Sequence, residues 1–567
     1  MSLIGALNIG KSALAVNQAG LQITGNNISN AGNADYSRQA PGITSNRDQQ
    51  LRPGVFLGTG VNLDNVKRQI DESLEQRLRG SNSDSESADT VQQWLSRVES
   101  TFNELTDDDL STRLSTFFNS WSDLANRPQD VGFRQVVVQN GASLAGSIRD
   151  LRSSLQTLVQ DADQRLQSVA IDADGLAQKV ADLNSQIVNA EGGTGGVANG
   201  LRDQRDAVLK QLAQLVDIQT VNDGSNINVY VNSEPLVVAS DNRGIGVRQE
   251  VVDGHQSTTL IFKSNGGSLT VSSGQAGGLL NARDQIDAVV DQMDDLAHGL
   301  IFELNKLHSA GQGLAGVSAV TSTNPVDDAT VALSDADAGL DFTPANGSFV
   351  VHVKNKMTGL VSSTLIEVDL DGLNANDTTL NSLASSLDAV GDVTASVDAS
   401  GVLRIATDST NLEVSFSQDT SGVLAALGVN GFFTGSNAVD IRVAASVTAN
   451  PSLLAAARNG SPGDNQTALA IAQLETDGVG SLNGATLKST YENMVNGVAV
   501  QASNAQNSAE SARTVRETLE TQRESLSGVS LDEEALNLMK YQRAYQGAAK
   551  LISTVNEMMD TLMNLVR

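Results

Sequence analysis

Cysteine is absent from the 567 residues, which excludes disulfides, thiolate nucleophiles and cysteine-ligated zinc sites. Aromatic residues make up only 3% of the sequence, which argues against a protein that stacks nucleic-acid bases. The formal net charge of −29 repels phosphate backbones, and the sequence has no basic patch to offset it. We therefore expect no nucleic-acid partner.

Long apolar runs are also missing. The longest strongly apolar stretch spans 423–429, far short of the ~18 residues that a membrane helix needs, so we expect no membrane insertion. The first residues, MSLIGALNIGKSALAV, lack a basic segment before an apolar one and do not resemble a cleaved signal peptide. A protein of this kind that leaves the cell must use another export route.

Catalytic and metal-binding signatures are not found. None of the four histidines occurs in a recognised ligand spacing; they are His255, His298, His308 and His352. The segment 311–316 fits G-x-G-x-x-G but follows a predicted helix instead of a strand, and is interpreted as a loop. We predict a protein that is not an enzyme, with no cofactor and no metal site.

The middle of the chain is strongly acidic. Residues 317–440 contain 16 acidic and 3 basic residues, which is typical of a solvated surface. Within this segment 369–372 hints at a calcium loop, but Leu373 and Asn374 occupy positions where an EF-hand needs an oxygen ligand and a glycine. A calcium-dependent secreted adhesin therefore stays open only as a remote alternative.

What the sequence does contain is helical periodicity, at both ends and through much of the first half. Apolar residues from Val137 to Ile187 are spaced alternately by three and four, which predicts one long helix with a coiled-coil seam. Further helices are predicted over 201–216, 279–310 and 487–526. Alternating segments predict strands over 222–270 and again within 317–440.

Both ends carry apolar stripes broader than a solitary surface helix needs. The final helix repeats in heptads, and the first has a stripe on one side and Ile9, Val16 and Ile23 roughly opposite. The two helices can pair and still leave apolar surface uncovered, which predicts assembly with neighbours. The predicted assembly residues are Leu7, Leu14, Leu21, Ile28, Leu538, Tyr541, Tyr545, Ile552, Val555, Met559 and Leu562.

The two ends together resemble the motifs shared by bacterial flagellar rod, hook and hook-associated proteins. The N-terminal motif lies within 7–39 and the C-terminal motif within 527–565. The most specific residues are Asn26, Asn27, Ile28, Ser29, Asn30, Tyr36, Arg38, Asp532, Glu533 and Gln542. We interpret Ser530 and Glu533 as a capping box at the start of the last helix.

Internal segments are similar to the hook-associated proteins of the hook–filament junction. These segments are 201–206 (LRDQRD), GGLLNARDQI from 277, and 427–443. The resemblance implies a structural subunit on the bacterial flagellum, exported unfolded by the flagellar type III apparatus. It further implies a cytoplasmic chaperone on the C-terminal helix, contacts with the hook protein and the second junction protein, and a ring of copies of the chain itself.

The predicted fold is mainly α with β-rich inserted parts and a discontinuous multi-domain layout. A terminal coiled-coil domain, 1–40 with 528–567, would form the inner tube. A helical-bundle middle domain would span 41–316 and 441–527, with a β-rich part at about 220–275. A β-rich outer domain would span 317–440. Another axial protein, either the hook subunit or the second junction protein, remains the nearest alternative.

Overall fold

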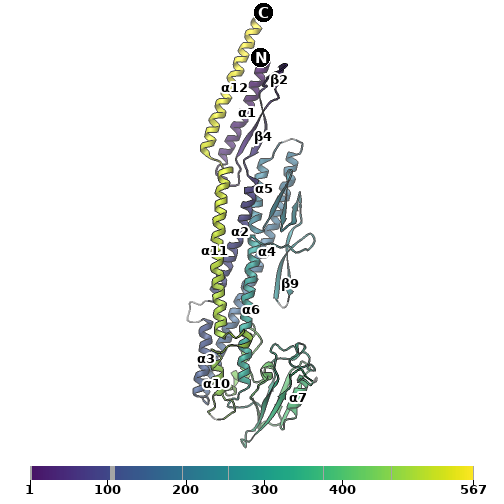
Figure 1. The fold of residues 1–567 in the computed structure, drawn as a ribbon, viewed down its shortest axis with the longest axis vertical. Helices are drawn as coiled ribbons and strands as arrows, with labels where there is room; N and C mark the ends of the chain where they lie inside the picture. Colours follow the sequence, from purple (N-terminus) through teal and green to yellow (C-terminus); the bar gives the residue numbers. More distant parts are fainter. Residues whose placement is uncertain are drawn as a thin grey trace. The chain divides into compact units, whose positions relative to one another are not determined.

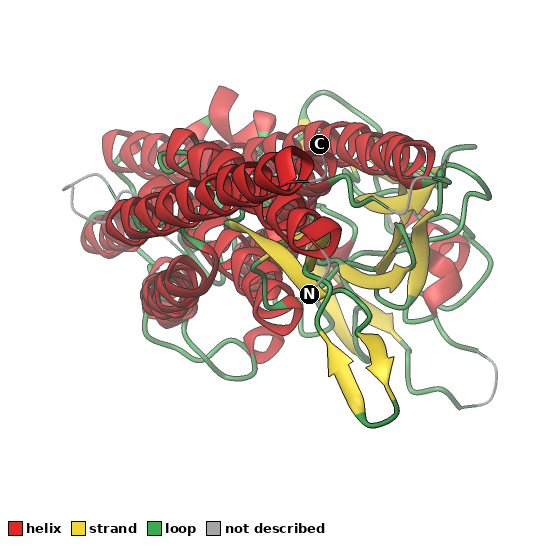
Figure 2. Ribbon diagram, turned by 90° about the horizontal axis from the view of Figure 1, so that it is seen from above, coloured by secondary structure: helices red, strands yellow, loops and turns green. Residues whose placement is uncertain are grey.

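The computed structural model describes residues 3–102, 109–193, 196–252, 255–373, 376–461 and 463–565. The chain divides into two compact units, each built from separate stretches of sequence. Unit 1 comprises 1–94, 161–283 and 503–567, and unit 2 comprises 95–160 and 284–502. Helices dominate, and the strands form several small antiparallel sheets (Figure 2). Within the described part of the chain, no helix is both long enough and apolar enough to span a bilayer.

Four long helices contribute residues to both units; they are α2 (Glu72–Phe102), α4 (Val131–Glu191), α6 (Gly274–Ser309) and α11 (Leu487–Ser527). The predicted long helix is confirmed, since α4 covers the whole three-and-four-spaced seam. Seam residues Leu155, Val169 and Val180 are fully buried, as knobs-into-holes packing requires.

The described part of unit 1 also contains three whole helices and ten strands. Its elements are α1 (Leu3–Ser29), β1 (Gln39–Ser45), β2 (Gln49–Arg52), β3 (Val55–Leu57), β4 (Val61–Arg68), α5 (Asn199–Leu215), β5 (Gln219–Asp223), β6 (Asn226–Val231), β7 (Glu234–Val238), β8 (Asp241–Asn242), β9 (Ile245–Val252), β10 (His255–Phe262) and α12 (Leu531–Leu565). The strands predicted over 222–270 are confirmed by β5 to β10. Strands β1 to β4 were not predicted, because QAPGITS and its partner lack a clean alternation of apolar and polar residues.

Unit 2 holds the acidic insert and a small helical region. Its elements are α3 (Leu110–Asn126), β11 (Ala319–Thr321), β12 (Gly347–Asn355), β13 (Val361–Val368), α7 (Leu380–Asp388), β14 (Val393–Val397), β15 (Leu403–Thr407), β16 (Leu412–Ser417), α8 (Val423–Ala426), β17 (Phe433–Thr434), β18 (Arg442–Val443), α9 (Ala445–Ala449) and α10 (Gln466–Gln473). The insert forms two three-stranded sheets, ordered β13-β12-β16 and β11-β15-β14. Helix α7, with a capping box at Thr379 and Ser382, was not predicted within this β-rich region.

An aromatic cluster in unit 2 surrounds His308, which is fully buried. The ring Nδ1 lies 2.7 Å from the Asn430 carbonyl oxygen, and the Ala455 N–H donates to Nε2 at 2.9 Å. Because a backbone N–H can only donate, the imidazole is neutral with its proton on Nδ1. Burial lowers the pKa of His308 to about 4. The residue is therefore part of the packed core, as the absence of ligand spacing suggested.

We predict that unit 2 loses stability in acid through His308. The unfolded chain binds a proton below the ordinary pKa of about 6.5, whereas the folded site binds one only near 4. The stabilisation is therefore complete above pH 6.5 and is lost as pH falls towards 4, by up to about 3 kcal/mol. H308N retains a donor towards Asn430 but does not titrate, so its stability should depend less on pH in this window.

Tryptophan fluorescence can measure this effect in unit 2 alone. The chain has two tryptophans, and the Trp121 ring centroid lies 6.2 Å from that of His308. In a W94F background, urea unfolding followed by Trp121 fluorescence at pH 7 and pH 4.5 compares the parent with H308N. Equal pH dependence in both proteins would show that His308 does not carry the acid sensitivity.

Candidate assembly site at the paired terminal helices

The first and last helices, α1 and α12, pack side by side and antiparallel, with both chain ends at the same end of the pair (Figure 1). Two glycines of α1 set how closely they approach. A Cβ added at Gly10 would lie 2.7 Å from Ile552, and one at Gly20 would lie 2.7 Å from the Tyr541 ring. The helices can approach this closely only because both positions lack side chains.

Most of the predicted α12 stripe packs on α1 within the same chain. Val555 is 1% exposed, and the half-buried members are Tyr541, Tyr545, Ile552 and Met559. Leu538 and Leu562 are 36% and 50% exposed. On α1 the opposite stripe is the more buried one, through Val16 and Ile23, while Leu7, Leu14, Leu21 and Ile28 are half-buried.

Apolar side chains of α12 outside the predicted assembly residues are also exposed, and two of them, Leu551 and Met558, widen the heptad stripe that the sequence predicts. Among the described side chains of α12, six long apolar ones outside the predicted assembly residues are at least 41% exposed; they are Leu531, Leu536, Met539, Leu551, Met558 and Met563. The periodicity predicts that the stripe contacts other subunits, but in the structure much of it packs on α1 of the same chain. The exposed side chains are what the pair leaves uncovered.

A buried asparagine on α1 joins the N-terminal motif to α12. Asn27 is 1% exposed, and its amide nitrogen donates to the Gln39 carbonyl at 2.9 Å and to Glu534 Oε2 at 3.0 Å. Its Oδ1 accepts from the Tyr36 hydroxyl at 2.7 Å and from the Gln39 N–H at 3.0 Å. The amide thus donates two hydrogen bonds and accepts two, which is the full capacity of an Asn side chain.

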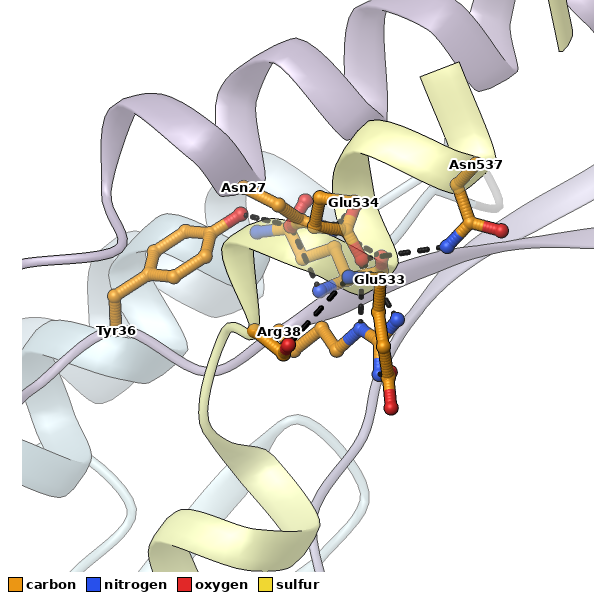
Figure 3. A network of polar contacts seen from close by, with 8 residues as sticks. Asn27, Tyr36, Arg38, Glu533, Glu534 and Asn537 are labelled. Carbon is orange, nitrogen blue, oxygen red and sulfur yellow. Dashed lines mark hydrogen bonds and ion pairs between the residues drawn. The ribbon is translucent and has the colours of Figure 1, made fainter. Parts of the chain in front are cut away.

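The carboxylate at the centre of this contact is Glu534, which is 2% exposed (Figure 3). Arg38 donates from Nε to Glu534 Oε1 at 2.9 Å, and its Nη2 lies 2.7 Å from the same oxygen. The Arg38 Nη1 donates to Glu533 Oε2 at 2.6 Å. We call Asn27, Tyr36, Arg38, Glu533 and Glu534 the terminal polar cluster.

The predicted capping box is only half formed. Ser530 Oγ accepts from the Glu533 N–H at 3.4 Å, as an N-cap should. The Glu533 carboxylate, however, pairs with Arg38, because a guanidinium is a stronger partner than a backbone N–H. Glu533 is 60% exposed in this pair, whereas Glu534 is 2% exposed. The capping-box spacing in the sequence therefore indicates the less buried of the two acids.

The other motif residues support the cluster or lie at the surface. Asn26 donates to the Tyr36 hydroxyl at 3.3 Å, Asn30 to the Asn26 carbonyl at 2.9 Å, and Ser29 to the Gly25 carbonyl at 2.8 Å. Asp532 and Gln542 are exposed. These two positions contribute nothing to the buried contact within the chain.

The electrostatics of the cluster favour one set of protonation states. Burial, together with the charges of Asp203 and Glu534, raises the pKa of Tyr36 to about 12, so its hydroxyl stays a donor. Burial alone would disfavour the charge on Arg38, but Glu533 and Glu534 outweigh it and raise the Arg38 pKa above its ordinary value. The cluster is therefore centred on Arg38, which keeps its positive charge.

The LRDQRD segment at the start of α5 forms a second charged hub in unit 1. Arg68 of β4 contacts Asp203 at 2.9 Å and Asp206 at 2.6 Å. Arg202 pairs with Glu191 at 2.8 Å, and hydrogen bonds from Arg202 above all lower the Glu191 pKa to about 2. These contacts tie α5 to β4 and to the end of α4.

The acidic insert places Asp369, Asp371 and Asp377 with carboxylate oxygens within 4.8 Å of one another. Asp377 accepts from the Gly372 N–H, and Asp369 accepts from Asn376. These bonds within the turn account for the arrangement. Asn374, part of the possible calcium loop considered above, lies outside the described residues.

Comparison with known families gives two matches along the chain. The profile described as flagellar hook-associated protein FlgK helical domain matches residues 95–321. The profile described as flagellar basal body rod FlgEFG protein C-terminal matches residues 521–565, which include α12.

Curated relatives match over nearly their full length. Flagellar hook-associated protein 1 of Salmonella typhimurium is 26% identical over 573 residues, covering 99% of each chain. The Escherichia coli K12 protein of the same name is 25% identical, again over 99% of each. The Bacillus subtilis protein is 24% identical over 98% of this chain and 97% of its own.

A solved structure shares the fold. The flagellar hook junction protein FlgK from Burkholderia pseudomallei aligns with a TM-score of 0.50 at 17% identity, covering 80% of this chain and 100% of that one. This likeness supports a mainly helical, multi-domain architecture.

We predict that the two neighbouring acids of the terminal polar cluster differ sharply in importance. E534Q leaves Arg38 without its buried partner and should destabilise the docking of α12 on α1 by about 3 kcal/mol. E533Q removes a partner that is 60% exposed, and should cost under about 1 kcal/mol. Amide hydrogen exchange across 531–565 measures the docking directly. Equal protection in the two variants would contradict the assignment.

Proposed function

The chain belongs to the flagellar hook-associated proteins, and we propose that it is the structural subunit that connects the hook to the filament. The observation that carries the proposal is the match over 99% of both chains to flagellar hook-associated protein 1. The hook subunit is a weaker candidate, because the helical-domain match over 95–321 is to a hook-associated protein. The adhesin alternative has no support in these relatives.

The family is structural, so the prediction that the protein is not an enzyme is confirmed by the relatives. We propose that copies of the chain assemble into a ring through the terminal helices. The exposed apolar residues of α12 and the half-buried stripe of α1 supply that contact, since apolar surface of this extent favours burial against neighbours.

We further propose an arrangement and a set of partners that the resemblance to this family implies. The terminal domain, 1–40 with 528–567, lines the inner tube, the middle domain surrounds it, and 317–440 lies outermost. The neighbours along the axis are the hook protein and the second junction protein. Export proceeds through the flagellar type III apparatus, with a cytoplasmic chaperone on α12 beforehand, and the final location is the extracellular flagellum.

We expect a strain that lacks this protein to build hooks without filaments. Filament subunits should then appear in the culture medium, because they are exported but have no junction on which to polymerise. Electron microscopy of the cells and immunoblots of the medium measure both effects, and a plasmid copy should restore filaments. Normal filaments in the deletion strain would overturn the proposed function.

The proposed assembly surface on α12 can be tested separately from folding. Leu551 and Met558 are 41% and 46% exposed, so L551D/M558D should leave the monomer melting temperature within about 2 °C of the parent. In the assembled ring the same charges would be buried without partners, which is costly. Cells with this variant should export the protein yet lack filaments.

A matched control uses Gln546 and Ser553, which are exposed polar residues also seven positions apart on α12. Q546D/S553D adds the same charge on a face of α12 that does not carry Leu551 and Met558, and should retain motility. Loss of motility in both variants would point to charge alone, and loss in neither would remove Leu551 and Met558 from the interface.

A further inference from the structure

A groove of about 810 Å³ lies beside the terminal polar cluster in unit 1. Its walls come from the last turns of α1, the loop before β1, strand β4 and the start of α5. Asn26, Asn30 and Gln204 line it, as does Asp35. Residues from both the N-terminal motif and LRDQRD therefore share one surface that the intrachain contacts leave open.

One buried acceptor in this groove has no partner. Asn199 is 8% exposed, and its amide nitrogen donates to the Val66 carbonyl at 2.8 Å. Because that carbonyl requires a donor, the orientation of the amide is settled. Its Oδ1 is buried and accepts no hydrogen bond within the described chain. Buried acceptors are nearly always satisfied, so this one calls for a donor from outside.

Asp203 offers a second acceptor in the same groove. The residue is 7% exposed, and its Oδ1 accepts from Arg68 at 2.9 Å. The carboxylate also accepts a hydrogen bond from Ser37, and its two oxygens together have lone pairs for a further donor. With Asp35 at the rim, the groove presents two carboxylates and a free amide oxygen, and none of the described residues that line it is basic. A cationic donor such as guanidinium suits this set.

The β2–β3 hairpin has the complementary side chains. Its strands pair with each other, and among the described residues neither packs extensively on another element. Arg52 is exposed at the turn, and Phe56 is 61% exposed in a chain with few aromatics. Arginine and aromatic residues are the usual anchors of protein interfaces. The groove has aliphatic walls at Ile23 and Val66 to receive the ring.

We propose that the β2–β3 hairpin of one copy docks in this groove of the neighbouring copy, with Arg52 directed to Asp35 at the rim as well as to the Asn199 and Asp203 acceptors. No hairpin residue lines the groove of its own chain, so the contact is between copies. Such a head-to-tail contact closes into a ring when the rotation between copies allows it. The inference deepens the proposed function and rests on it, because it requires copies to be neighbours in the flagellum.

Cross-linking in intact flagella tests the contact. The chain lacks cysteine, so P53C at the hairpin turn and Q204C in the groove provide the only reactive sites. Treatment of isolated hook–filament structures with a short bis-maleimide should give a ladder of chain multimers on a denaturing gel. Each single variant should give none, and neither should Q204C with K356C, which places the second cysteine in the insert.

A charge exchange tests the chemistry. Arg52 and Asp35 are both exposed, so R52E and D35R should leave the monomer melting temperature unchanged. Each alone should reduce the number of filamented cells at least about tenfold, and R52E/D35R together should restore it.

The outcomes separate the two proposals. Filaments with this protein at the junction but no ladder, or no rescue by the double exchange, would overturn the hairpin contact and leave the function intact. A cross-linked product with a different flagellar protein would overturn the choice of a second copy as the occupant. A protein that is absent from the hook–filament structures altogether would overturn the proposed function itself.

Discussion

The arrangement of the chain ends depends on one buried ionic contact, that of Arg38 with Glu534. The two residues are 496 positions apart, and Glu534 is 2% exposed. A carboxylate this deeply buried is stable only with a paired charge and further hydrogen bonds. Arg38 supplies the charge and Asn27 the hydrogen bond, so the loop after α1, the helix α1 and the helix α12 are held by the same group.

This contact suits the proposed function, in which the chain is exported unfolded and must form specific contacts once folded. Apolar packing between α1 and α12 is tolerant of sliding by a heptad, whereas a buried polar pair permits one register, a role best known from coiled coils. Glu534 opposite Asn27, Tyr541 against Gly20 and Ile552 against Gly10 all belong to that register. The exposed apolar residues of α12 are thereby presented in a defined direction.

The heptad pattern predicts part of the site. Extending the pattern towards the start of α12 also predicts the buried acid at its centre. The stripe from Leu562 back to Leu538 continues at a spacing of four to Glu534, which places an acid on an apolar seam. Such an acid needs a basic partner, and Arg38 of the N-terminal motif is one. The local spacing of Ser530 and Glu533 instead favoured a capping box, which the structure forms only in part.

The sequence by itself determined the long helices, most strands of the insert and the pairing of the terminal helices, because these follow from local periodicity and from stripes too broad to stay in water. The tertiary structure alone decided which stripe of α1 is buried, which face of α12 is left exposed, and where β1 to β4 pair. It also brought the N-terminal motif and LRDQRD onto one groove. Those features depend on contacts between distant residues, and no local pattern specifies the partner.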